Sequence, residues 1–132
     1  MAELSVGISV YKNNNPKFLL NSLKSVTWGQ KYKPSKLIIV IDGKISSELE
    51  SLINTFVDKS TIKTLILKNK TNKGLTYSLN KMISACETKY FARMDADDIS
   101  LDLRFQKQVD FLNKNPNIDI LGSRAIDIDE NG

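Results

Sequence analysis

Short aliphatic runs and stretches with helical spacing alternate along the chain. Uninterrupted aliphatic runs are typical of strands that are buried on both faces of a parallel sheet, and apolar residues three or four positions apart are typical of helices. The runs predict strands at residues 5–11, 37–41, 62–67, 90–94 and 118–121. Each of the first four runs is followed by a polar segment and then by a stretch with helical spacing.

The stretches between the runs predict four amphipathic helices. Their apolar positions are Phe18, Leu19, Leu23 and Val26; Leu49, Leu52, Ile53 and Phe56; Leu75, Leu79, Met82, Ile83 and Cys86; and Leu101, Phe105, Val109 and Leu112. Ser46 or Ser47 is a suitable cap for the second helix, and Asn115-Pro116 ends the fourth. Alternating strands and helices predict an α/β fold, a doubly wound and mainly parallel sheet with helices on both faces. We expect one domain over residues 1–132, without repeats or linkers.

Composition narrows the class of protein. A hydrophobic content of 41% in 132 residues is enough for a packed core, and 19 basic against 15 acidic residues give a net charge of +4. The lysines are scattered, so the charge predicts solubility and a mild affinity for anions but no nucleic-acid binding. A chain with Cys86 as its one cysteine and no histidine has no disulfide framework and is a poor candidate for zinc sites or histidine-dependent triads.

No apolar run reaches the length of a membrane span, and no signal-peptide pattern precedes the first strand. We therefore expect a cytoplasmic protein. The sequence carries no visible signal of oligomeric state.

Polar or glycine-containing segments follow the first four predicted strands. They are residues 11–15, Asp42-Gly43, residues 72–74 and residues 95–98. In doubly wound sheets, ligands bind beyond the carboxyl ends of the strands, where the strand order reverses. The sequence therefore predicts a ligand site at this edge of the sheet.

The last of these segments carries three carboxylates within four positions, at Asp95, Asp97 and Asp98. Alternation along an extended chain points Asp95 and Asp97 to the same side, where two hard oxygen ligands could hold Mg²⁺ or Mn²⁺ against a diphosphate. The alternative is a solvated loop in which Asp98 caps a helix beginning near Leu101.

Four motifs in order carry a resemblance to a known family. They are SVGISVY at 5–11, LIIVIDG at 37–43, NKG at 72–74 with SLN at 78–80, and RMDADD at 93–98 with Arg104. Together they resemble the family 2 glycosyltransferases, more narrowly the bacterial branch that builds exopolysaccharide, capsule and O-chains, including amylovoran-type enzymes. The resemblance implies a GT-A domain that binds a nucleoside-diphosphate sugar, with UDP as the expected carrier. The sugar would pass, with inversion, to a glycan or lipid-linked acceptor.

The resemblance also implies roles for residues that bind the nucleotide. The end of the first strand, Val10 and Tyr11, would contact base and ribose largely through the backbone, and Asp42 would accept a hydrogen bond from the base. For Asp42-Gly43 the alternative is a simple turn. Asn72 and Gly74 would lie beside the diphosphate, where Gly74 allows close approach and the helix N-terminus offers free N–H groups.

The resemblance implies a different role for each aspartate of the acidic segment. Asp95 would lie on the ribose side, and Asp97 would bind the Mg²⁺ or Mn²⁺ that bridges the two phosphates. Asp98 keeps a supporting or capping role. We expect Arg93 and Arg104 to hold the loop by pairing with these carboxylates.

Three further residues have weaker assignments. Lys70 and Lys73 could add positive charge beside the diphosphate, although loop lysines are usually solvated. Asn80 matches a recurring asparagine of the family and could equally be a residue of the helix surface.

Residues 127–132 reproduce the first half of a calcium-binding EF-hand loop. The incoming helix is missing, because residues 118–128 have the pattern of a strand, and the closing glutamate is absent. We expect a hairpin turn at residues 130–132 instead.

Inversion requires a general base, and the family places that acid well downstream of the metal-binding segment. We expect it beyond Gly132, together with the acceptor-binding part, so that these residues are the donor-binding portion of a longer enzyme.

A full-length protein could contact the inner face of the plasma membrane to reach a lipid-linked acceptor. No basic amphipathic helix in this sequence supports such contact.

Two alternatives differ in class. A sugar-nucleotide nucleotidyltransferase would begin with a glycine- and arginine-rich loop, whereas residues 6–15 contain only Gly7 and no arginine. A non-catalytic nucleotide-binding module is the other alternative.

Overall fold

The computed structural model describes residues 3–132 and contains a four-stranded sheet in the order β3-β2-β1-β4. The elements in chain order are β1 (Leu4–Val10), α1 (Pro16–Val26), β2 (Lys36–Asp42), α2 (Ser47–Lys59), β3 (Lys63–Asn69), α3 (Leu75–Ser84), β4 (Tyr90–Met94) and α4 (Arg104–Lys114). All three strand pairings are parallel. The first four predicted strands are confirmed, with bounds that differ by at most two residues.

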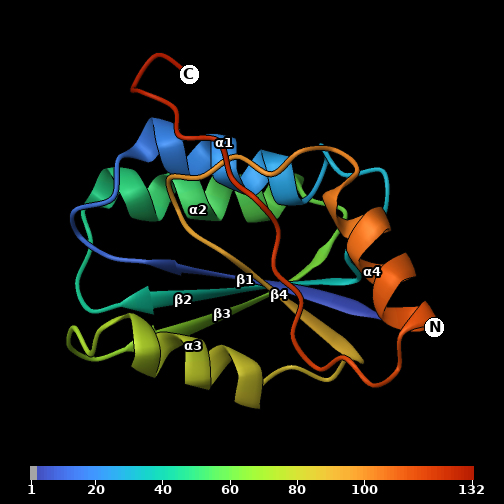
Figure 1. Cartoon of the computed structure of the whole chain (residues 1–132). Coiled ribbons are helices and arrows are strands. Elements are labelled where there is room, and N and C mark those ends of the chain that lie inside the picture. The colour runs from blue at the N-terminus through green and yellow to red at the C-terminus, as the bar shows by residue number, and fades with distance from the viewer. Residues whose placement is uncertain (1–2) are drawn as a thin grey trace.

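Helices cover both faces of the sheet, which confirms the predicted doubly wound α/β architecture. Helices α1 and α2 lie on one face and α3 on the other, while α4 lies beside the start of β4 (Figure 1). The larger core fills the space under α1 and α2 and includes Phe105 and Val109 of α4. The smaller core, between Ile38 and Met82, is closed by α3, and Cys86 packs against it just beyond the end of that helix.

Side chains cap the first two helices, and the second begins at the predicted cap. The side chain of Asn15 accepts hydrogen bonds from the N–H groups of Lys17 and Phe18, and Pro16 occupies the first turn, where its missing N–H costs nothing. Ser46 accepts from the N–H of Leu49 and is the cap of α2. No helix in the described part of the chain is long and apolar enough to cross a membrane.

The fourth helix differs from the prediction. It begins at Arg104 after Leu103, which offers no capping side chain, rather than near Leu101. The prediction that Asp98 caps this helix is wrong, because an irregular segment separates them. The N–H of Asp98 instead donates to the carbonyl of Asp95 at 3.4 Å, within a turn.

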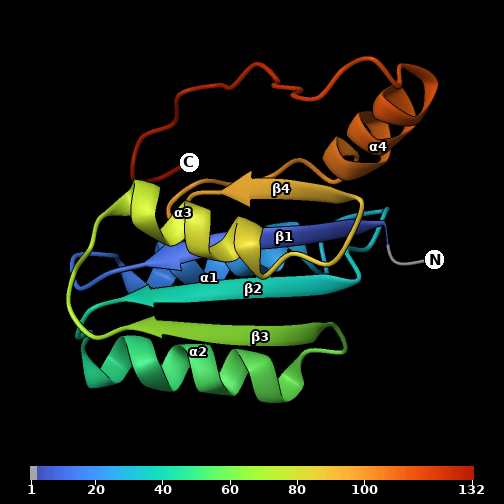
Figure 2. The same ribbon diagram turned by 90° about the horizontal axis from the view of Figure 1, so that it is seen from below.

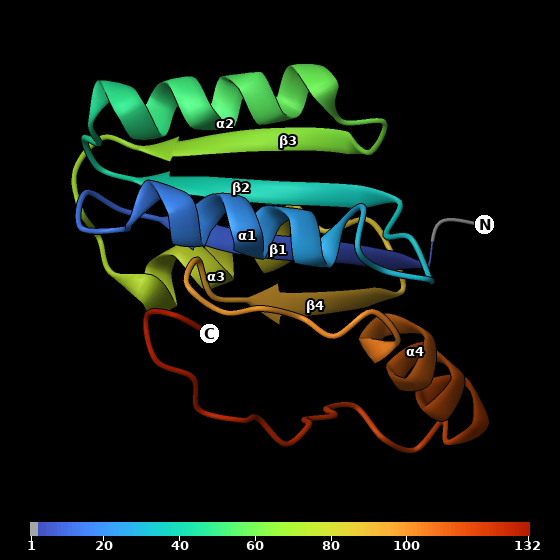
Figure 3. The same ribbon diagram turned by 90° about the horizontal axis from the view of Figure 1, so that it is seen from above.

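The fifth predicted strand, residues 118–121, is not formed. The chain after α4 runs without regular structure past the β4 side of the sheet (Figures 2 and 3). The side chains of Ile120 and Ile126 are 90% and 85% exposed. A strand requires a partner for its backbone groups, and within residues 3–132 no neighbouring strand pairs with this segment.

The turn expected at the end of this segment is present, but the hairpin is not. The N–H of Gly132 donates to the carbonyl of Asp129 at 3.1 Å, and the N–H of Asn131 donates to Asp129 Oδ1 at 2.9 Å. No strands flank the turn, since the preceding segment is irregular.

Candidate functional site

The sheet reverses its order between β1 and β4. The chain proceeds outward from β1 to β2 and β3, and then crosses back to place β4 on the other side of β1. Ligands of such sheets bind beyond the carboxyl ends of the strands at this reversal. A hollow of about 400 Å³ lies there, lined by Ser9, Tyr11, Asn14, Asp42, Asn72, Gly74, Leu75, Asp95, Ala96 and Asp97.

The hollow brings together most of the residues that the sequence nominated. They come from the ends of three strands and from the loop before α3, and are Tyr11, Asp42, Asn72, Gly74, Asp95 and Asp97. Val10 does not line the hollow, because its side chain is fully buried in the core and only its backbone could contact a ligand. The roles of these residues in binding stay predictions.

Four lining residues were not named individually as site residues, and they are Ser9, Asn14, Leu75 and Ala96. Ser9 is a polar residue next to the carboxyl end of β1, a signal that could have nominated it. Asn14 closes the loop after β1, since its Oδ1 accepts from the N–H of Tyr11 at 2.8 Å. Leu75, the first residue of α3, belongs to the apolar pattern of that helix but is 45% exposed.

The charged side chains of the lining are all carboxylates, from Asp42, Asp95 and Asp97. Like charges in one hollow repel each other and would repel an anionic ligand unless a cation shared the site. In the described residues, no three or more acidic or cysteine side chains converge to hold an ion by themselves. A divalent cation here would therefore have to share its coordination with oxygens of the ligand and water, as Mg²⁺ commonly does.

The carboxylates of the acidic segment have different surroundings. Asp95 pairs with Arg93, whose Nη2 lies 3.1 Å from Oδ1, and the Asp95 carbonyl accepts from Ser22 Oγ at 2.7 Å. Asp97 is exposed, and no hydrogen bond or ion pair to its side chain is present in the described residues. The pKa of Asp98 is raised by partial burial and then by the charges of Asp95 and Asp97.

The two arginines hold this segment in different ways. The predicted pairing with a carboxylate is confirmed for Arg93. For Arg104 it is wrong: Nη2 donates to the carbonyl of Arg93 at 3.0 Å, and Nε donates to Gln108 at 3.1 Å. Burial lowers the pKa of Arg104, and the nearby charge of Asp98 opposes that effect. Arg104 thus fixes the end of β4 to α4.

Asp42 is buried, and both of its oxygens accept hydrogen bonds. Oδ1 accepts from Asn69 Nδ2 at 2.9 Å and from the N–H of Lys73 at 2.7 Å, while Oδ2 accepts from the N–H of Gly74 at 2.9 Å. Burial by itself raises the pKa of Asp42, but these hydrogen bonds outweigh burial and the pKa is lowered. Asp42 is therefore ionised at neutral pH and caps the start of α3, where Gly74 has no side chain to do so.

The loop before α3 directs two of its backbone N–H groups to Asp42. The N–H groups of Lys73 and Gly74 donate to that carboxylate, so they are not available to an anion. Binding of a diphosphate at the N-terminus of α3, which begins at Leu75, stays a prediction. The Lys73 and Lys70 side chains are exposed and do not line the hollow, and Asn80 is exposed on α3.

The turn at Gly43 contacts the same loop. Gly43 has φ +85°, and a Cβ atom there would lie 2.7 Å from the backbone nitrogen of Asn72. Asp42-Gly43 thus also has the structural role of a turn: Asp42 accepts hydrogen bonds from the loop before α3, and Gly43 packs closely against that loop.

Gln30, which no sequence motif singles out, holds the segment after the acidic cluster. It is 1% exposed, and its Nε2 donates to the carbonyl of Leu101 at 2.7 Å and to Ser100 Oγ at 3.1 Å. Its Oε1 accepts from the N–H of Phe105 at 3.1 Å, which caps α4 from a distant loop. No local pattern marks a glutamine in a loop as buried.

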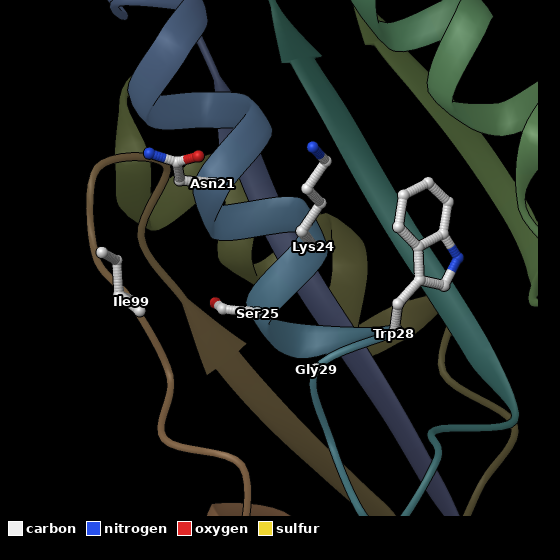
Figure 4. Close-up of a pocket in the computed structure, with 6 residues that line it drawn as sticks. All are labelled: Asn21, Lys24, Ser25, Trp28, Gly29 and Ile99. Carbon is white, nitrogen blue, oxygen red and sulfur yellow. The ribbon is translucent and has the colours of Figure 1, made fainter.

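A second hollow, of about 530 Å³, lies on the outer side of α1 (Figure 4). Trp28 and Ile99 flank the end of α1 on opposite sides, and Lys24 is the one charged residue of the lining. This hollow contains no carboxylate and lies away from the carboxyl ends of the strands, so it is not the candidate site.

Comparison with known proteins agrees with this geometry. Residues 5–132 match the profile of the family described as Glycosyl transferase family 2. The chain belongs to this family. Among relatives, it is 31% identical over 128 residues to the amylovoran biosynthesis glycosyltransferase AmsE of Erwinia amylovora, a match that covers 97% of this chain and 47% of AmsE. This confirms the predicted family and its amylovoran-type branch as relatives.

A second relative has a name that states its reaction. The UDP-Gal:alpha-D-GlcNAc-diphosphoundecaprenol beta-1,3-galactosyltransferase of Escherichia coli is 35% identical over 121 residues, which cover 92% of this chain and 43% of that protein. The family 2 chain described here spans less than half the length of the curated relatives it matches.

The fold also matches solved structures. The mannosyltransferase PcManGT from Pyrobaculum calidifontis, solved with GDP-Man and Mn²⁺, superposes with a TM-score of 0.72 over 83% of this chain and 32% of that chain, at 16% identity. At this identity the match shows the fold alone, and it confirms the predicted fold of GT-A type.

Proposed function

We propose that this family 2 chain is the donor-binding part of a metal-dependent, inverting glycosyltransferase that uses a UDP-sugar in the synthesis of cell-surface polysaccharide. The acceptor would be a glycan or a lipid-linked glycan. The observation that carries the proposal is the hollow at the reversal of the sheet, with Asp42, Asp95 and Asp97 in its lining and no basic side chain. The names of the two bacterial relatives support this class of reaction.

The charge of the hollow supports a divalent cation. A nucleoside diphosphate is an anion, and carboxylates alone would repel it. Asp97 is exposed with free oxygens, so it is the best placed ligand for Mg²⁺ or Mn²⁺, with Asp95 beside it on the same hollow. When bound, such an ion neutralises the charge that develops on the leaving diphosphate. Mn²⁺ accompanies GDP-Man in the structure of PcManGT, which supports a divalent ion of this kind.

The hydrogen bonds of Asp42 support uracil over guanine as the base. Each carboxylate oxygen accepts about two hydrogen bonds, so Oδ1 is filled by Asn69 and Lys73, and Oδ2 keeps one position beside Gly74. The imide of uracil offers one N–H to such an acceptor. Guanine offers two neighbouring donors, N1–H and the N2 amino group, which fit two free acceptors better than one.

The general base stays a prediction for sequence beyond Gly132, since the three carboxylates of the hollow are assigned to the nucleotide and the metal. Family membership favours this function over a nucleotidyltransferase. A non-catalytic module would bind the same donor but would transfer no sugar from it.

Calorimetric titration of UDP with and without Mn²⁺ tests the proposal. We expect binding that depends on Mn²⁺, weaker binding of GDP, and an affinity about tenfold lower or more for Asp97→Ala, because a carboxylate ligand contributes more than one ordinary hydrogen bond.

Asp58→Ala is the matched control, since Asp58 is an exposed carboxylate at the end of α2. This variant should bind UDP like the wild type. Absence of UDP binding in the presence of Mn²⁺, or equal binding by Asp97→Ala, would contradict the proposal.

A further inference from the structure

A row of hydrogen-bonded polar side chains leads from the hollow to Lys81 of α3. Asn69 Nδ2 donates to Asp42 Oδ1 at 2.9 Å and to Ser78 Oγ at 3.1 Å. On its other end, Asn69 Oδ1 accepts from Lys81 Nζ at 3.0 Å. Of these four residues only Asp42 lines the hollow, so the others can affect a ligand only through it.

The fold places these residues side by side although they are far apart in the sequence. Asp42 and Asn69 are register partners at the carboxyl ends of β2 and β3. Lys81 extends from α3 and also donates to the carbonyl of Lys68 at 2.9 Å, so it ties the end of β3 to the helix. The Lys81 ammonium group is therefore held by two acceptors, the Lys68 carbonyl and Asn69 Oδ1.

The chemistry of the row selects one orientation of the Asn69 amide. A carboxylate only accepts and an ammonium group only donates, whereas an amide has an end of each kind. Lys81 and Asp42 thus favour the same orientation, and a flipped amide would turn its oxygen toward the Asp42 carboxylate. Asn69 is 7% exposed, so water cannot readily replace a lost partner.

We propose that Lys81 is a positioning residue of the nucleotide site, which acts through Asn69 to hold Asp42. This rests on the proposed function, because the site it serves is the donor site. With Lys81 in place, the Asp42 carboxylate holds the N–H groups of Lys73 and Gly74 and keeps its remaining acceptor position directed to the hollow. Without it, the Asn69 amide and the loop before α3 lose their fixed positions.

The test compares UDP affinity in the presence of Mn²⁺ for the wild type, Lys81→Met and Lys81→Arg. We expect Lys81→Met to raise the Kd for UDP by about tenfold, the effect of roughly one charge-assisted hydrogen bond. Lys81→Arg should bind nearly as the wild type does, because the guanidinium group also donates to both acceptors. Lys59→Met, which removes an exposed lysine from the end of α2, is the matched control and should not change the Kd.

A second measurement needs no ligand. The backbone amide signal of Gly74 and the side-chain amide signals of Asn69, recorded by NMR, should shift in Lys81→Met and not in Lys59→Met. If Lys81→Met does not fold, Lys81→Gln replaces it, since a neutral donor at this position should give a smaller shift of the same kind.

The outcomes separate this inference from the proposed function. A Kd for Lys81→Met equal to that of the wild type, or unshifted amide signals, overturns the inference. If the wild type itself does not bind UDP, the proposed function is wrong, and the Gly74 and Asn69 signals alone then decide whether Lys81 positions Asp42.

Discussion

Asp42 shows how one residue connects the sheet to the candidate site. The carboxylate ends β2, caps α3 through two backbone N–H groups, and still lines the hollow. A structural role and a binding role are therefore compatible at Asp42, since a carboxylate has more acceptor positions than the protein uses. The neighbouring Gly43 makes this possible, because its backbone leaves room for the loop at Asn72.

Gly43→Ala should destabilise the protein by about 1–3 kcal/mol, because alanine is strained at φ +85° and its Cβ would lie 2.7 Å from the Asn72 nitrogen. Urea unfolding measures this change. Gly122→Ala is the control, since a Cβ there meets nothing within 4 Å. Equal stability of Gly43→Ala and the wild type would show that the loop can move away without cost.

Among the elements, α4 and the segment before it are held by a residue distant in sequence. The helix has no capping side chain of its own, and Gln30 supplies the missing acceptor to Phe105 while its amide donates to Leu101 and Ser100. The acidic segment lies between this anchor and β4. The position of Asp97 and Asp98 therefore depends on a loop between α1 and β2.

Gln30→Ala should lower the free energy of unfolding by about 1–3 kcal/mol, because it leaves buried backbone groups without partners. Amide hydrogen exchange at residues 99–105 should also become faster. Gln106→Ala is the control within α4, because the side-chain amide of Gln106 donates to Asp110 at the exposed surface. Unchanged exchange at Phe105 in Gln30→Ala would contradict this role.

At the scale of the whole molecule, the strand order assembles the site. Placing β4 next to β1 brings Tyr11 and Asp95 into the lining of one hollow, and β2 adds Asp42. Residues 115–132 contribute none of the lining and carry exposed isoleucines at positions 118, 120, 126 and 128. Neither the sheet nor the hollow depends on them.

Removal of residues 118–132 should therefore change the free energy of unfolding by no more than about 0.5 kcal/mol, the usual range for exposed positions. Urea unfolding of the shortened chain measures this, and UDP titration should give the Kd of the full chain. A large loss of stability would show that this segment packs on the fold in solution.

The sequence by itself determined the first four strands, the four helices between and after them, the family, and the polar segments that meet at one edge of the sheet. These features are local or periodic, so aliphatic runs, caps such as Ser46 and short motifs carry them. Only the tertiary structure decided how the polar groups are paired: Asp42 with Lys73 and Gly74, Asn69 with Lys81, and Gln30 with Phe105. The structure also shows that residues 118–121 form no strand, because a strand forms only where another backbone lies beside it. Hydrogen-bond partners distant in sequence depend on which strand ends lie together, and no local pattern records that.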